Sequence, residues 1–485
     1  MSGGRWIAGL VLLGCAAAAG AQDRGLRQDS IPPLPDSLRL YGGTLPTRLD
    51  LPLFAPPEDA VPLSLDEAVF IALGQNPDLA VSVLEAARAA NDVTLGNAGY
   101  LPTLDADAQV GGSRRGGFDG GTDSTGGNVA ASTSLSGAVT LGYTVWDGGR
   151  RAATLRRLEA ESRRFDLLAD ADAEALALDV TVAYLDAARL VALADAFAEA
   201  VAVSEDRLRI AQAEVRIGTS AEIDAALALA DYNADRSAVL QQLVLLAGAR
   251  ASLGGLLALP DPEAVVLTDS LALGPAPDLD ALVAGAGDGR FVRSLEASEA
   301  AAAQSIAEVR SEYRPTVRVS AGLGLGVADR GFLPPNLAPT VGPEVVYGLS
   351  ASLPIFDAGE RGRRLQNARI RLRQAEWTTE AERTDRRARA ARLAASAEGY
   401  RALVELETLN EDIARQNVRV ALAQLRLGFI TPVDLRQVQL ALVDVRRRRV
   451  EAVFQARRAE AELRLLGGDL LPEGVVPPGM TEAGG

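Results

Sequence analysis

Two pairs of segments alternate between apolar and polar residues, the pattern of β-strands with one apolar and one polar face. The first pair covers about 103–111 and 134–146, and the second covers about 316–327 and 345–356. In the first segment, four apolar residues are interleaved with three polar ones: Leu104, Ala106, Ala108 and Val110 with Asp105, Asp107 and Gln109. We predict four strands of about 9 to 12 residues, long enough to cross a bilayer when tilted. Residues 111–133 are rich in Gly, Ser and Asp, and we expect a loop there.

Two interpretations of these strands are open. In the first, they form an antiparallel sheet folded over a soluble core. We favour the second, in which they cross a membrane, because aromatic residues lie where an interfacial girdle would be expected: Tyr143, Trp146, Tyr347 and Phe356. Four strands cannot close a barrel alone, and each backbone group left unpaired in lipid costs several kcal/mol. Two copies of the chain would supply eight strands, and three copies would supply twelve.

Each strand pair is followed by an Ala-rich, charged stretch with almost no helix-breaking residues. Residues 150–216 contain no Pro or Gly, and residues 360–427 contain only Gly362 and Gly399. At about 1.5 Å per residue, each stretch would form a helix on the order of 100 Å long. The abundant Ala permits close approach of neighbouring helices, so we expect a coiled-coil-like wall. A freestanding coiled coil would also explain these helices, but it leaves the repeated strands unexplained.

The chain contains one structural unit twice. Its first motif begins at Tyr100 and recurs 213 positions later at Tyr313. Three motifs recur in this way: Tyr100-Leu-Pro-Thr as Tyr313-Arg-Pro-Thr, Trp146-Asp-Gly-Gly as Phe356-Asp-Ala-Gly, and Ile217-Gly as Leu427-Gly. In each copy a strand pair leads into a long helix. Such a duplication predicts one composite body rather than several independent domains.

The rest of the chain divides around the two copies. Ser64 and Glu67 have the spacing of a capping box and mark the start of the first helix. Each repeat is expected to hold a helix, a strand pair and long helices. We predict these segments: a signal peptide over 1–21 (or a lipoprotein signal over 1–14), a Pro-rich tether over 22–63, a first repeat over 64–257, a linker over 258–290, a second repeat over 291–468 and a disordered tail over 469–485.

The N-terminus has the features of a secretory signal: Arg5, an apolar stretch over 6–13 and small residues after it. Two cleavage sites compete. Residues 19–21 (Ala-Gly-Ala) fit a signal peptidase site, whereas residues 12–15 (Leu-Leu-Gly-Cys) resemble a lipobox that would leave Cys15 as an acylated N-terminus. Beyond the signal, we expect no run of the roughly 18 uncharged apolar residues that a helical span requires. An exported chain of this kind is either soluble in the periplasm or crosses the membrane by β-structure.

Composition argues against several functional classes. The 485 residues carry 49 Lys plus Arg against 64 Asp plus Glu, and the net charge of −15 would repel nucleic-acid phosphates. There is no His and only one Cys, which removes imidazole catalysis, the commonest zinc sites and internal disulfides. We expect no cofactor and no enzymatic activity; a carboxylate hydrolase is an alternative that no residue cluster supports. The Arg-rich runs 383–392 and 446–449 are interpreted as solvated or ion-paired helix faces.

Each long helix reaches a glycine, Gly218 or Gly428, after which a new helix follows. Glycine tolerates the left-handed conformation that caps a helix C-terminus, so we predict the tips of two helical hairpins there. Asp224 and Asp434 follow the glycine by six positions in both copies, within the first turns of the returning helices. A favourable interaction with the helix N-terminus, worth about 0.3 to 1 kcal/mol, is one explanation for these aspartates.

With these motifs the chain resembles the TolC-like outer membrane efflux proteins, from about Ser64 to Gly468. The resemblance rests on Tyr-x-Pro before each strand pair, (Trp/Phe)-Asp-x-Gly after it, and the Gly-to-Asp spacing of the tips, all in duplicate. It implies a fold that is mainly α with a transmembrane β-barrel: a homotrimer whose twelve strands form one barrel in outer membrane lipid, continuous with a periplasmic α-helical barrel. It also implies a passive exit duct, joined to an inner-membrane transporter through a periplasmic adaptor protein.

The resemblance implies roles for the tip residues as well. Gly218 and Gly428 mark the adaptor-facing tips, and Asp224 and Asp434 correspond to acidic positions that line the channel entrance. From three chains these aspartates would supply six carboxylates. We therefore expect an entrance that attracts cations.

The chain departs from TolC near the second tip. Leu425 and Ile430 stand where TolC has a Tyr and an Arg that help to hold its entrance shut, so that lock does not carry over. Gln437 stands where the family has a third acidic residue at the entrance, so an acidic ring there would contain fewer carboxylates. Two points stay open: the alternative function is a periplasmic coiled-coil scaffold or adaptor without a pore, and the sequence does not distinguish drug, metal or protein as cargo.

Overall fold

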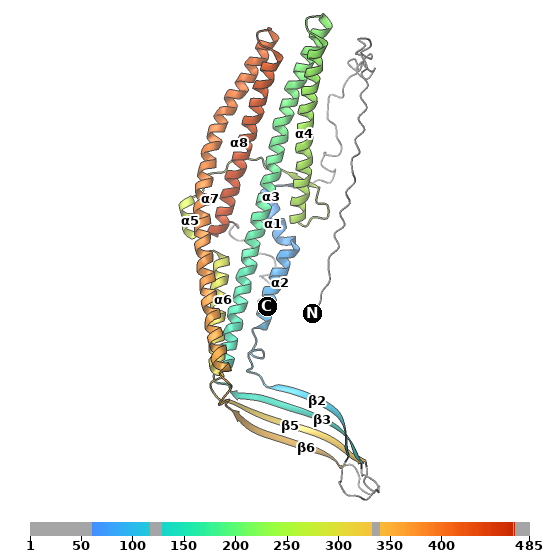
Figure 1. Ribbon diagram of the computed structural model, residues 1–485, viewed down its shortest axis with the longest axis vertical. Coiled ribbons are helices and arrows are strands. Elements are labelled where there is room, and N and C mark those ends of the chain that lie inside the picture. The colour runs from blue at the N-terminus through green and yellow to red at the C-terminus, as the bar shows by residue number, and fades with distance from the viewer. Residues whose placement is uncertain (1–60, 117–128, 332–339, 469, 471–485) are drawn as a thin grey trace, which may run out of the picture. The chain divides into compact units, whose positions relative to one another are not determined.

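The computed structural model describes residues 61–116, 129–331, 340–468 and 470. The expected signal peptide with Cys15 and most of the Pro-rich tether and tail lie outside these residues. The described part of the chain is mainly helical and contains one four-stranded sheet and one two-stranded sheet (Figure 1).

The predicted strands form a single antiparallel sheet. Strand β2 (Thr103–Gly116) pairs with β3 (Val129–Trp146), and β5 (Thr316–Gly331) pairs with β6 (Thr340–Ser352). Strands β3 and β5 also pair, so the order β2-β3-β5-β6 joins the two copies of the unit through their inner strands. Strands β2 and β6 are the outer strands, and each has one neighbour in the sheet that the described residues form.

The strands differ from the prediction at their ends. Strands β2 and β3 extend into residues 111–133, where we expected a loop, because backbone hydrogen bonds continue the ladder beyond the alternating pattern. Strand β6 ends at Ser352 rather than near residue 356, since Pro354 has no N–H to donate to a ladder. The side-chain pattern therefore locates the strands but not their limits.

The register collects the apolar residues of all four strands on one face of the sheet. Three rows across the strands belong to this face: Leu104–Leu141–Ala321–Tyr347, Ala106–Val139–Leu323–Val345 and Tyr143–Val319–Leu349. The opposite face carries mostly small or polar residues, with Val346 as an exception. Two of its rows are Thr103–Gly142–Ser320–Gly348 and Asp107–Ala138–Gly324–Glu344. Most large side chains of the apolar face are exposed, so the sheet has an uncovered apolar surface in the single chain.

Two helical hairpins adjoin the sheet. Helices α3 (Arg150–Ile217) and α4 (Glu222–Leu256) form the first, and α7 (Glu360–Arg426) and α8 (Pro432–Gly467) form the second. Helix α3 has 68 residues and α7 has 67, so at about 1.5 Å per residue each is on the order of 100 Å long. The two hairpins contact each other mainly through α3 and α8. Small and branched apolar residues fill the packed positions, which lets the helix axes approach closely.

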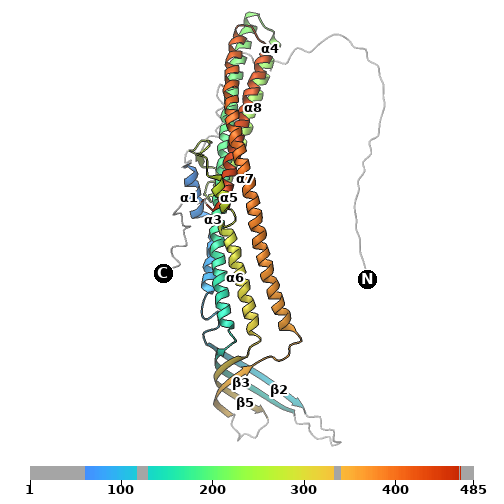
Figure 2. The ribbon, with the colours of Figure 1, turned by 90° about the vertical axis from the view of Figure 1, so that its left-hand side faces the viewer.

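Shorter helices pack beside the long ones. Helices α1 (Leu65–Gln75) and α2 (Pro77–Asp92) lie against α3, and α6 (Arg290–Ser311) lies against both α3 and α7 (Figure 2). Helix α5 (Leu279–Gly285) contacts α7 and α8. The capping box predicted at the start of α1 is present, with reciprocal hydrogen bonds between residues 64 and 67.

A small parallel sheet ties the start of the first repeat to the segment between the repeats. Strand β1 (Val61–Leu63) pairs with β4 (Val265–Leu267), which lies in the segment that we expected to be a linker. The buried Tyr184 of α3 stabilises this pairing: its hydroxyl donates to the carbonyl of Leu63 (2.9 Å) and accepts from the N–H of Asp269 (3.1 Å).

Helix α4 is long and apolar enough to cross a membrane, judged by length and composition alone. Its longest run without a charged residue covers only residues 237–249, between two arginines, so the expectation that no uncharged apolar run of roughly 18 residues follows the signal is not contradicted by this helix. Its Leu246 packs against Ala187 and Leu190 of α3, although only 17% of its most apolar window is buried in the described chain. Because α4 returns along α3 as the second helix of a hairpin, we interpret its apolar surface as a helix-packing face.

Candidate functional site at the strand–helix junctions and hairpin tips

The first repeated motif builds the junction between strand β3 and helix α3. The Asp147 carboxylate accepts hydrogen bonds from the N–H groups of Gly149 (3.1 Å) and Arg151 (2.9 Å). The Arg151 guanidinium stacks over the Tyr100 ring at 5.0 Å and donates to the carbonyls of residues 144–145. Gly149 has a φ of 95°, a conformation that glycine adopts without steric cost. Together these contacts fix the direction in which α3 leaves the sheet.

The second copy repeats this junction between strand β6 and helix α7. The Asp357 carboxylate accepts from the N–H of Gly359 (3.2 Å) and from the Nε of Arg361 (2.6 Å), whose guanidinium lies 5.1 Å from the centre of the Tyr313 ring. These hydrogen bonds, with the Arg361 side chain as the largest contributor, lower the pKa of Asp357. Both junctions thus use an Asp, a left-handed Gly, an Arg and a Tyr.

Sequence analysis did not identify Arg151 and Arg361 as parts of these junctions. Each follows the motif glycine by two positions, so the signal Asp-x-Gly-x-Arg was present in both copies. Further arginines beside both positions obscure this motif in the sequence.

An additional contact links the junctions of the two copies. The Nη1 of Arg314 donates to the carbonyl of Gly148 at 2.7 Å. Gly148 has a φ of +70°, and a Cβ at this position would lie 2.7 Å from the Cβ of Arg314. The close approach therefore requires a glycine at position 148.

The first hairpin tip has the predicted glycine cap. Gly218 has a φ of 76° and ends α3. The Asp224 carboxylate in the first turn of α4 accepts from the Ser220 hydroxyl (2.6 Å) and from the N–H of Ala221 (3.2 Å), which is the N-cap residue. Asp224 thus stabilises the start of the returning helix.

The second tip has the same arrangement. Gly428, with a φ of +74°, follows the last turn of α7. The Asp434 carboxylate accepts from the hydroxyl (2.7 Å) and the N–H (2.9 Å) of Thr431, the N-cap of α8. These two hydrogen bonds, the hydroxyl first, lower the pKa of Asp434. Helix capping therefore accounts for the repeated aspartates locally, and a role at a channel entrance stays a prediction.

Apolar side chains surround the tip turns and are exposed in the single chain. They come from both copies: Ile217, Ile223, Leu427, Phe429 and Val433. Leu425, by contrast, is buried against Ala421 and Leu435, and Ile430 packs against the same cluster. The two positions that differ from TolC thus contribute to the packing of the second hairpin.

Ion pairs connect the two hairpins below the tips. Arg436 of α8 forms a bidentate pair with Asp235 of α4, at 2.7 and 2.8 Å. The neighbouring Asp231 of α4 lies 3.9 Å from the Arg436 Nε and also pairs with Arg207 of α3 within the first hairpin. Farther from the tip, Arg446 of α8 contacts both hairpins, through Glu411 of α7 (3.1 Å) and Glu199 of α3.

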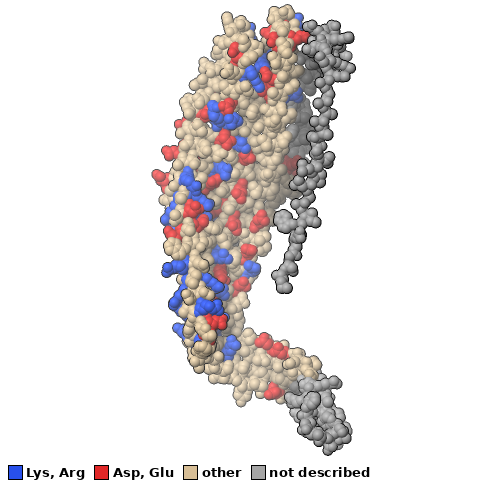
Figure 3. All heavy atoms as spheres, in the orientation of Figure 1, with Lys and Arg blue, Asp and Glu red and all other residues tan. Residues whose placement is uncertain are grey.

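The two Arg-rich runs are largely ion-paired. Figure 3 shows positive and negative side chains intermixed along the helices. The pairs include Arg383–Glu296, Arg386–Glu382, Arg389–Asp385, Arg447–Asp444, Arg448–Glu407 and Arg449–Glu411. The interpretation of these runs as ion-paired helix faces is confirmed for these arginines.

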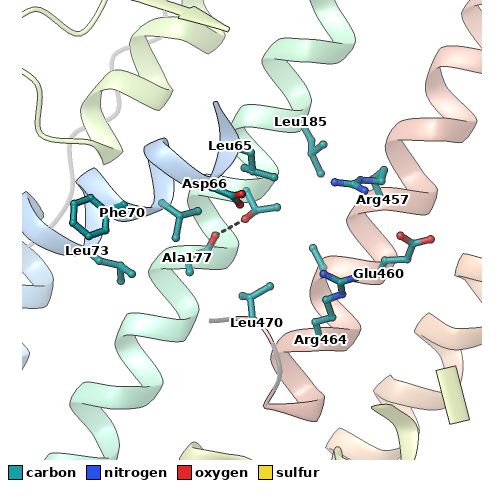
Figure 4. Close-up of a pocket in the computed structure, with 13 residues that line it drawn as sticks. Leu65, Asp66, Phe70, Leu73, Ala177, Leu185, Arg457, Glu460, Arg464 and Leu470 are labelled. Atoms are coloured by element: carbon teal, nitrogen blue, oxygen red, sulfur yellow. Dashed lines mark hydrogen bonds between the residues drawn. The ribbon is translucent and has the colours of Figure 1, made fainter. Parts of the chain in front are cut away.

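A pocket of about 130 Å³ lies between α1, α3 and α8 (Figure 4). Arg457 and Arg464 of α8 line it opposite residues of α1 and α3, whereas the carboxylate of Glu460 points away and pairs with Arg401 of α7. The Thr181 hydroxyl donates to the Ala177 carbonyl (2.7 Å). Within the described residues there is no group of three or more His, Cys, Asp or Glu side chains that could hold a metal ion. We assign no chemistry to this pocket.

Comparison with known proteins identifies the family and the fold of this chain. Residues 70–258 and 290–469 match the family described as outer membrane efflux protein, so this chain belongs to that family. No curated protein sequence matches the chain.

Several solved structures have the same fold. The Campylobacter jejuni CmeC outer membrane channel is 15% identical, with a TM-score of 0.69 over 86% of this chain and 89% of that one. The outer membrane protein VceC from Vibrio cholerae is 17% identical, with a TM-score of 0.67 over 84% and 97%. The Neisseria gonorrhoeae MtrE outer membrane channel, solved in its open state, is 20% identical, with a TM-score of 0.67 over 84% and 89%. At these identities the similarity establishes the fold.

Proposed function

We propose that this chain is one subunit of an outer membrane exit duct in a tripartite efflux or type I secretion system. The observation that carries the proposal is the four-stranded sheet with one exposed apolar face and two outer strands that each have a single neighbour among the residues that the structure describes. In lipid, such edges must be paired by another chain. Membership of the outer membrane efflux protein family supports the same conclusion.

Three copies would close the sheet into a barrel of twelve strands. The apolar face would then contact lipid, and the opposite face, which carries Asp105, Asp107 and Glu344, would line a water-filled lumen. The long helices would continue this barrel into the periplasm. Their exposed apolar positions, on α4 among others, would be covered by the helices of neighbouring copies.

The hairpin tips are the proposed docking sites for a periplasmic adaptor protein. Gly218 and Gly428 form the turns, and exposed apolar side chains flank them. Asp224 and Asp434 would line the entrance and attract cations. The duct itself would be passive, and the inner-membrane transporter joined through the adaptor would supply both the driving force and the choice of cargo.

Extraction and electrical recording test this function. The mature protein should resist a carbonate wash of membranes, require detergent for extraction, behave as a trimer on sedimentation and form conducting channels in a planar bilayer. A Cys15→Ala variant is the control, because it excludes attachment through an acylated cysteine. A detergent-free, soluble monomer without conductance would support the alternative of a periplasmic scaffold.

A further inference from the structure

We propose that a second copy of this chain pairs with the sheet edge in one defined register, with β6 of one copy antiparallel to β2 of the next. We call this contact the seam. The inference rests on the proposed function, because it specifies how neighbouring subunits of the barrel meet. The seam brings defined residues of β6 and β2 opposite each other, and it also brings the strand–helix junctions of the two copies into contact.

The register follows from the internal duplication. Residues of β2 correspond to residues of β5 at an offset of 213, from Tyr100 to Tyr313, and residues of β3 correspond to those of β6 at an offset of 210, from Trp146 to Phe356. Strands β3 and β5 are neighbours that come from different copies of the unit, so their register is a template for contact between units. Replacing each template residue by its counterpart gives the register of the seam.

The derived register keeps apolar residues opposite apolar residues. The template pair Val139–Leu323 becomes Leu349 opposite Val110 of the second copy. Within β6 the same derivation places Ala351 opposite Ala108, and Ser352 opposite Asp107 on the polar face. Carried past Ser352, the last residue of β6, the same offsets place Leu353 level with Ala106 and Phe356 level with Leu104. The alternation of apolar and polar residues in β2 and β6 therefore agrees with a register that follows from the two offsets alone. A shift by one residue would bring apolar residues onto the polar face.

Side-chain exposure also identifies the seam. Leu349 is 73% exposed, whereas its counterpart Val139, which has a neighbour on both sides, is 43% exposed. Val110 is 75% exposed, and its counterpart Leu323 is 53% exposed. The outer strands therefore leave uncovered the surface that the inner strands cover with each other.

The contact between the two strand–helix junctions of one chain has a counterpart at the seam, but residues of a different type make it. In the chain, Arg314 donates to the carbonyl of Gly148. The counterparts at the seam are Leu101 of the second copy and Ala358, which also has a positive φ of 53°. Leu101 is exposed in the single chain. A hydrogen bond from a long polar side chain onto Gly148 is thus replaced by an apolar contact between Leu101 and Ala358.

A disulfide between copies tests the register. The double variant Leu349→Cys with Val110→Cys should form inter-chain disulfides in oxidised membranes, seen as cross-linked oligomers on a non-reducing gel. Within one chain these positions lie three strand spacings apart, about 14 Å, and are also offset along the strands, because Val110 is level with Val341, eight residues or about 26 Å from Leu349. Both separations are beyond disulfide reach. The matched control is Leu349→Cys with Ala106→Cys, shifted by four residues or about 13 Å, which should not cross-link. Single-cysteine variants account for any bond to Cys15.

The outcomes separate the register from the proposed function. Cross-linking of the shifted control, or no cross-linking of the first pair in an intact conducting oligomer, would overturn the register and leave the proposed function standing. A soluble monomer would overturn both. If the apolar pair of cysteines prevents assembly, Ser352→Cys with Asp107→Cys reports the same register from the polar face.

Discussion

At the scale of single residues, the repeated aspartates stabilise local structure. Asp147 and Asp357 organise the turns from strand to helix, and Asp224 and Asp434 accept hydrogen bonds at the starts of α4 and α8. Recurrence at the same offset therefore does not by itself indicate a transport role. The two roles are compatible, because a carboxylate that caps a helix at an exposed tip also contributes a fixed negative charge there.

We predict that Asp434→Asn weakens the block of single channels by divalent cations added on the periplasmic side, by roughly threefold or more. The lowered pKa keeps the Asp434 carboxylate charged at neutral pH, and the Asn side chain removes the charge while retaining an oxygen that accepts at the cap. Asp444→Asn removes the same charge farther along α8 and should leave the block unchanged. An unaltered block in the Asp434 variant would contradict the entrance role.

The same contacts predict how the second tip responds to pH. Since the pKa of Asp434 is lower in the folded chain, its stabilising contribution is fully present above the ordinary Asp pKa of about 3.9 and is lost as pH falls through the folded value. Backbone hydrogen exchange over residues 431–437 should therefore show an acid-dependent loss of protection. Comparison with Asp434→Asn at each pH cancels the intrinsic exchange rate, and the variant should lack this step. A step that persists in the variant would assign it to another group.

At the scale of elements, charged contacts hold together helices whose packed positions are small. Arg436 joins α8 to α4, and Arg446 joins α8 to both α7 and α3. Ordinary exposed pairs on a single helix contribute little, whereas these side chains are mostly buried and join different hairpins. The contact between hairpins near the tips therefore depends on a few specific arginines.

We predict that Arg436→Gln loosens the contact between the hairpins by about 1 to 3 kcal/mol, because it leaves the buried Asp235 without its bidentate partner. Hydrogen exchange of α4 and the first half of α8 should accelerate accordingly. Arg447→Gln is the matched control, since its pair with Asp444 is exposed and lies within one helix. Adding Asp235→Asn to the Arg436 variant should restore part of the protection. Equal effects of the two single variants would argue against a specific link.

At the scale of the whole molecule, the sequence predicts what depends on local periodicity. Alternation locates the strands, and long stretches with almost no Pro or Gly locate α3 and α7. Contacts between distant segments leave no periodic pattern in the sequence, as for Arg436 and Asp235, which are 201 positions apart. The ends of β2 and β3 were not predicted either, because their ladder continues through backbone groups that every sequence carries. The strand order was likewise not predicted, because the pairing of β3 with β5 joins the two copies across the first hairpin.

The proposed orientation of the sheet in the membrane leads to a prediction with an internal control. Val139 and Thr140 are adjacent in β3 and lie on the apolar and polar faces respectively. If the apolar face contacts lipid, Val139→Lys should destabilise the inserted protein by about 2 to 4 kcal/mol near the membrane midplane and reduce the amount of assembled oligomer. Thr140→Lys should still insert, because its charge would face water, and should shift ion selectivity away from cations. Folding titrations from lipid vesicles and reversal potentials in salt gradients measure the two effects. Equal loss of assembly in both variants would mean that neither face is in water, and the proposed lumen would have to be abandoned.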